Sequence, residues 1–139
     1  MKLLLFLAVL FLISCSLPPG KKSAAESYFL TEVKPVLQQQ CLRCHNGTMP
    51  APALNLTSRS AAFKRGASGL EYIVPGASDR SHLITAVQRK GTHAKLMPRA
   101  DISLTDDQIG MLREWITDGA FWPTGEAGEL RPQSSREHP

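Results

Sequence analysis

Two cysteines and a histidine stand together in the segment CLRCH, residues 41–45. Because the thiols of Cys41 and Cys44 are three residues apart, one helical turn places both sulfur atoms on the same side. His45 follows the second thiol directly. Cys15 is the only other cysteine, so we expect the chemistry of the protein to depend on this segment.

The C-x-x-C-H spacing is typical of covalent haem attachment. The two sulfur atoms can bond to the two vinyl groups along one edge of a haem, and the histidine is close enough to bind the iron from the proximal face. The sequence therefore predicts one covalent haem c, held by Cys41 and Cys44, with His45 as the proximal iron ligand.

Three other interpretations of the motif stay open at this point. A thioredoxin-like redox pair needs a βαβ setting, which the sequence pattern does not offer. A structural zinc site would have to recruit His82 or His93 at unusual spacing. A structural disulfide between Cys41 and Cys44 would leave His45 without a role.

A haem held by one histidine needs a second axial ligand to be six-coordinate. Met97 lies in the loop THAKLMPR, far enough along the chain from His45 to reach the opposite face of the ring. Pro98 stiffens this loop and lowers the entropy lost on binding. We predict Met97 as the distal ligand, with His93 in the same loop as the alternative.

The N-terminus has the pattern of an export signal. A lysine at position 2 precedes the apolar run LLLFLAVLFLI, which is shorter than the roughly 20 residues that span a bilayer. The end of the run, LISC, resembles the lipobox of bacterial lipoproteins, in which cleavage precedes a lipidated cysteine. We expect a signal peptide at 1–14, a lipidated Cys15, and a periplasm-facing location on the inner or outer membrane. An incidental Cys15 in a secretory signal and an uncleaved anchor are the alternatives.

The length of 139 residues leaves room for one small domain. Residues 15–24 read as the lipid-anchored tether, 25–123 as the folded domain, and the polar stretch 124–139 as a disordered tail.

Helical periodicity predicts an all-α domain with short helices and long loops. The first helix covers about 25–40 and is interrupted by Pro35, so it is either kinked or split in two. A short helix follows Ser58, after an extended piece in which Leu54 and Leu56 point inward. Another follows the Pro75–Gly76 turn, with Ser78 or Asp79 as its cap. The last is capped by Thr105 with Gln108 and stopped by Gly119.

The loops between the predicted helices are long for a small domain, which suggests that a bound group organises them. We expect the envelope of the haem to include Trp115, Leu112, Val74 and Leu83. The net charge of +4 is not gathered into a basic patch with interleaved aromatic residues, so the composition does not favour a nucleic-acid partner.

Five segments in order resemble the small monohaem cytochrome c module of planctomycetes and related bacteria. They are FLTEVKPVLQQQCLRCH, LNLTSRSAAFKRG, IVPGASDRSHLITAV, LMPR and LTDDQIGMLREWITDGAFWP. The resemblance implies a class I cytochrome c fold with its terminal helices crossing beside the haem. It also implies electron transfer, with Met97 as distal ligand. The chain departs from the family pattern in having Asn46 and Gly47 where a glycine usually follows the histidine, and Arg99 where a second proline usually follows Met97–Pro98.

These features together predict a membrane-tethered electron carrier, without substrate turnover, that alternates between Fe(II) and Fe(III). Its expected partners are redox proteins of the cell envelope. The alternatives are a haem enzyme or a gas or redox sensor with a labile distal ligand, and a docking module in which the haem is structural.

Overall fold

The computed structural model describes residues 23–48, 54–66, 69–88 and 104–132. Helices are the only regular secondary structure in these ranges, which confirms the all-α class. None of the helices within them is long and apolar enough to cross a membrane. The predicted signal peptide and Cys15 lie outside the described residues.

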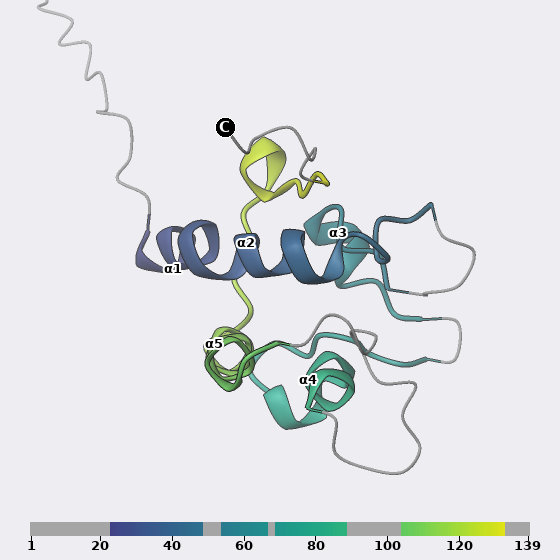
Figure 1. Ribbon diagram of the computed structural model, residues 1–139, viewed down its shortest axis with the longest axis vertical. Coiled ribbons are helices and arrows are strands. Elements are labelled where there is room, and N and C mark those ends of the chain that lie inside the picture. The colour runs from purple at the N-terminus through teal and green to yellow at the C-terminus, as the bar shows by residue number, and fades with distance from the viewer. Residues whose placement is uncertain (1–22, 49–53, 67–68, 89–103, 133–139) are drawn as a thin grey trace, which may run out of the picture.

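One continuous helical segment leads into the CLRCH motif (Figure 1). It comprises α1 (Ala24–Tyr28), the π-helical turn η1 (Phe29–Val33), α2 (Lys34–Val36) and the π-helical turn η2 (Leu37–Cys41). Proline lacks the N–H that an α-helix would use, and π-helical turns lie on both sides of Pro35. The chain therefore passes Pro35 without splitting into two helices.

The last long helix, α5 (Asp106–Thr117), begins and ends as the sequence predicts. The Thr105 hydroxyl accepts a hydrogen bond from the Gln108 amide, and the Gln108 side chain accepts one from the Thr105 amide. Gly119 follows the helix with φ of +102°, and the Ala120 amide donates back to the Trp115 carbonyl. The predicted cap and stop are both confirmed.

Three shorter helices connect these two. Ser58 caps α3 (Arg59–Ala62) by accepting from the Ala61 amide, as predicted. The cap predicted at Ser78 or Asp79 is wrong, because these residues form the 3-10 turn η3 (Ser78–Arg80) and α4 (His82–Val87) begins after Ser81. The Ser81 hydroxyl does not cap α4. It accepts from the Val74 amide and donates to the Ala77 carbonyl instead, which holds the turn between them.

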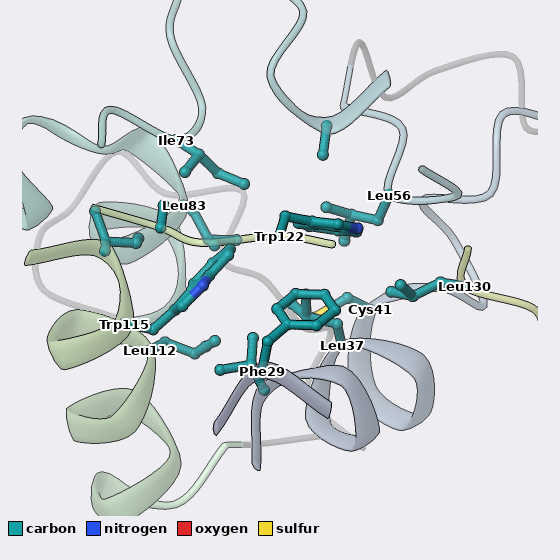
Figure 2. Close-up of a cluster of buried hydrophobic side chains, with 14 of the residues drawn as sticks. Phe29, Leu37, Cys41, Leu56, Ile73, Leu83, Leu112, Trp115, Trp122 and Leu130 are labelled. Atoms are coloured by element: carbon teal, nitrogen blue, oxygen red, sulfur yellow. The ribbon is translucent and has the colours of Figure 1, made fainter. Parts of the chain in front are cut away.

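The N-terminal helical segment and α5 cross at a steep angle, since Figure 1 shows one from the side and the other end-on. At the crossing, the ring of Phe29 lies 6.1 Å from Trp115 and 4.9 Å from Trp122, between centroids. The Tyr28 hydroxyl donates to the Glu114 carboxylate at the rim. Figure 2 shows this aromatic group at the centre of one buried cluster. The cluster also contains Val33, Leu37, Cys41, Leu42, Leu54, Leu56, Ala62, Ile73, Leu83, Ile84, Leu112, Ile116, Ala120 and Leu130.

The packed structure continues past residue 123, where the sequence analysis placed the start of a disordered tail. Residues Gly125–Gly128 form the 3-10 turn η4, and the Trp122 indole N–H donates to the Gly128 carbonyl at 2.7 Å. Beyond the turn, Leu130 is buried in the core. Polar composition is a poor guide here, because a single buried leucine, a close-packed glycine and backbone hydrogen bonds anchor a mostly polar segment. A Cβ on Gly128 would lie 1.8 Å from the Pro123 carbonyl oxygen.

The capping box at α5 gives a stability prediction. Thr105→Ala should lower the free energy of unfolding by about 1 kcal/mol, because the Gln108 amide loses its acceptor. Thr105→Ser keeps that oxygen and serves as the control, with stability close to wild type. Denaturant unfolding of the haem-loaded protein measures both. Equal losses in the two variants would show that the threonine methyl group, and not the cap, carries the effect.

Candidate functional site

The two cysteines of the motif differ sharply in exposure. Cys41 ends η2 and is only 8% exposed, whereas Cys44 lies in the following turn and is exposed. Both are free thiols, so no disulfide joins them. Burial, with a smaller contribution from the neighbouring Cys44, raises the pKa of the Cys41 thiol to about 12. One sulfur atom therefore belongs to the core and the other to the surface. This differs from the expectation that one helical turn places both on the same side, because the helical segment ends at Cys41 and Cys44 lies beyond it.

A tight turn sets His45 beside Cys41. The amides of Cys44 and His45 both donate to the Cys41 carbonyl, at 3.1 and 3.0 Å. The three residues of the predicted attachment site are thereby fixed around one backbone oxygen.

The ring of His45 is half-buried, and its Nδ1 lies 3.2 Å from the Leu54 carbonyl oxygen. Since a carbonyl can only accept, Nδ1 carries the proton and Nε2 keeps its lone pair. Burial lowers the pKa of His45, partly offset by this hydrogen bond, so the neutral ring is favoured. A neutral imidazole with one nitrogen held by a carbonyl is the form in which histidine binds a metal.

A second hydrogen bond holds the backbone of the same histidine. The Leu56 amide donates to the His45 carbonyl at 2.8 Å. Leu54 and Leu56 are themselves buried, as predicted, so both contacts to His45 come from a segment anchored in the core. Sequence reasoning did not assign this support, because the contacting groups belong to the backbone and leave no mark on residue type.

The Asn46–Gly47 pair, where the chain departs from the family pattern, forms a compact turn. The Asn46 side-chain oxygen accepts from the amide and the hydroxyl of Thr48, at 3.0 and 2.7 Å. Gly47 has φ of +80°, and a Cβ there would lie 2.6 Å from the side-chain nitrogen of Asn55. The glycine is thus needed one position later than in the family pattern, both for its φ and for its lack of a side chain.

Three of the four predicted envelope residues share the buried cluster with Cys41 (Figure 2). These are Leu83, Leu112 and Trp115, whereas Val74 is half-buried. Trp115 also packs on Phe29 and donates its indole N–H to the Phe121 carbonyl, so it has a structural role of its own. Contact of these residues with a haem stays a prediction.

The ligands predicted outside the CLRCH motif are Met97 and His93 for iron and His82 or His93 for zinc, and of these only His82 lies within the described residues. Met97 and His93 lie outside them. His82 is exposed on α4, with its ring 5.9 Å from that of Tyr72, and Met111 packs against the core as a filling residue. Within the described ranges, no three His, Cys, Asp or Glu residues gather into a metal site, so nothing there supports zinc.

An all-α domain with a CLRCH turn, and a neutral histidine whose Nε2 keeps its lone pair, has features that a c-type cytochrome requires. Residues 41–101 match the family model described as Planctomycete cytochrome C. This part of the chain is similar to that family, and the match begins at Cys41, the first residue of the motif. The family implies haem c as the cofactor, and the C-x-x-C-H spacing and the hydrogen-bonded His45 fit that group. No curated protein and no solved structure matches the chain.

The turn after His45 gives a second prediction. Gly76→Ala is the control, because Gly76 also has a positive φ but a Cβ there meets nothing within 4 Å. That control should lose about 1–2 kcal/mol of stability from backbone strain alone. Gly47→Ala should lose more, because its Cβ must also displace Asn55 from its present position. Denaturant unfolding of the haem-loaded protein compares the two, and equal losses would contradict a role for the Asn55 contact.

Proposed function

We propose that this protein is a monohaem c-type cytochrome that carries electrons at the cell envelope. The hydrogen bond from His45 Nδ1 to the Leu54 carbonyl is the observation that carries the proposal beyond the motif itself. When bound, haem c supplies one-electron chemistry by alternating between ferrous and ferric iron.

In this proposal, Cys41 and Cys44 form the thioether links and His45 is the proximal ligand. The Leu54 carbonyl fixes the tautomer and the orientation of the ring and makes Nε2 a better electron donor. The Leu56 amide holds the His45 backbone. An electron carrier benefits from such restraint, because a fixed ligand changes little between the two oxidation states.

The surface around the motif supports exchange with a partner protein. Cys44 and its neighbour Arg43 are both exposed, so the attachment turn reaches the surface. The partner is a redox protein of the same compartment. No feature of the described residues favours turnover of a substrate over electron transfer.

We assign the distal position to Met97, whose thioether would raise the reduction potential relative to a second histidine. The lipid on Cys15 would hold the domain at a membrane, with its acyl chains buried among the lipids.

The assignment of Met97 predicts a spectroscopic change. The protein, expressed with a haem-attachment system, should keep its haem in denaturant and give a low-spin spectrum with a weak sulfur-to-iron band near the red end. Met97→Ala should abolish that band, whereas Met111→Leu, on α5, should leave it unchanged. A band that survives in Met97→Ala would exclude Met97. Wild-type protein without covalent haem would overturn the proposed function.

The assignment of Cys15 predicts a change in cellular fractionation. Wild-type protein should sediment with membranes, whereas Cys15→Ser should lose its lipid and leave the membrane fraction. The haem spectrum should be the same in both, because Cys15 lies outside the haem motif. Cys15→Ser protein that still sediments with membranes would contradict the lipid anchor.

A further inference from the structure

Residues 124–132, which we call the C-terminal strap, contact both segments that hold the attachment site. The Leu130 amide donates to the Thr57 carbonyl at 2.9 Å. On the opposite side, the Gln38 side chain of η2 donates to the Arg131 carbonyl at 2.8 Å. The Lys34 ammonium donates to the Ala127 carbonyl, also at 2.8 Å. The strap therefore joins the helix that carries Cys41 to the segment that contacts His45.

The Thr57 end of this connection leads directly to His45. Asn55 links the segment internally, because its side-chain oxygen accepts from the amide and the hydroxyl of Thr57, at 2.9 and 2.8 Å. The same short segment supplies the Leu54 carbonyl and the Leu56 amide to His45. Residues 54–57 are thus bonded to His45 on one side and to the strap on the other.

The strap is itself held firmly. Leu130 is 2% exposed and lies in the cluster that contains Leu37, Leu56 and Cys41, as Figure 2 shows. The indole of Trp122 fixes η4 through the Gly128 carbonyl. Because it has a buried side chain and hydrogen bonds to two different segments, the strap is an ordered part of the domain that connects those segments.

We propose that the C-terminal strap positions His45, by holding residues 54–57 against η2 so that the Leu54 carbonyl stays aligned with Nδ1. Leu130 and Gln38 are then positioning residues that act through the histidine. The inference rests on the proposed function, because the alignment matters for electron transfer only if His45 binds the iron. If the strap loosens, the Nδ1 hydrogen bond weakens, the ring donates less to the iron, and the reduction potential rises.

Two pairs of variants of the full-length, haem-loaded protein test this role. Leu130→Ala removes the buried side chain of the strap, and Ile84→Ala, an isomeric buried residue on α4, is the control for general loss of packing. Gln38→Ala removes a single hydrogen bond to the strap and leaves the core intact. Its control is Gln39→Ala, an exposed neighbour on the same helix.

Amide hydrogen exchange and the reduction potential are the measurements. In Leu130→Ala, the Leu56 amide should exchange about tenfold faster than in wild type, relative to the amides of α5. Gln38→Ala should show the same change to a smaller extent. In both, the potential should rise, whereas Ile84→Ala and Gln39→Ala should leave the potential and the relative exchange of Leu56 unchanged.

Two outcomes would overturn the proposal. If the Leu56 and α5 amides accelerate equally and the potential does not move, the strap contributes only to global stability. If the Leu56 amide does not change in either strap variant, the strap does not hold residues 54–57. Absence of covalent haem in the wild type would instead refute the proposed function, while the exchange measurement would still decide whether the strap braces this segment.

Discussion

The pair of hydrogen bonds between His45 and the Leu54–Leu56 segment is the contact on which the rest of the site depends. One bond sets which ring nitrogen carries the proton, and the other fixes the backbone beneath the ring. Both depend on buried leucines, so the apolar core determines the orientation of a polar side chain. The function of the site is therefore inseparable from the packing of the domain around it.

Much of the architecture was predictable because local signals were strong. The α5 capping box and the Gly119 stop arise from contacts between residues close in the chain, and both are confirmed. The cap of α4 was not predictable in the same way. Ser81 has the right side chain for a cap, yet its hydroxyl is taken by the turn from Val74 to Ala77. Tertiary contacts here override local preference.

The sequence carries the chemical signal of the candidate site but not its supports. The spacing of Cys41, Cys44 and His45 predicts haem attachment, and the family match begins there. The Leu54 carbonyl and Leu56 amide are backbone groups that any residue provides, and the strap looked like a polar tail. Aromatic residues make up only 6% of the chain, yet Phe29, Trp115 and Trp122 meet in one place. Composition counts residues without showing where they gather.

The π-helical turns before the motif have a consequence for the length of the N-terminal helix. A π-helical turn accommodates one more residue than an α-helical turn, and each residue of an α-helix rotates the chain by about 100°. Deleting one residue from η1 would therefore convert it to an α-helical turn and leave Cys41 close to its present angle around the helix axis. Deleting one residue from α2, which has no extra residue to lose, would instead rotate Cys41 by about 100° and out of the core. The π-helical turns thus allow the length of this segment to vary while the direction of Cys41 is kept.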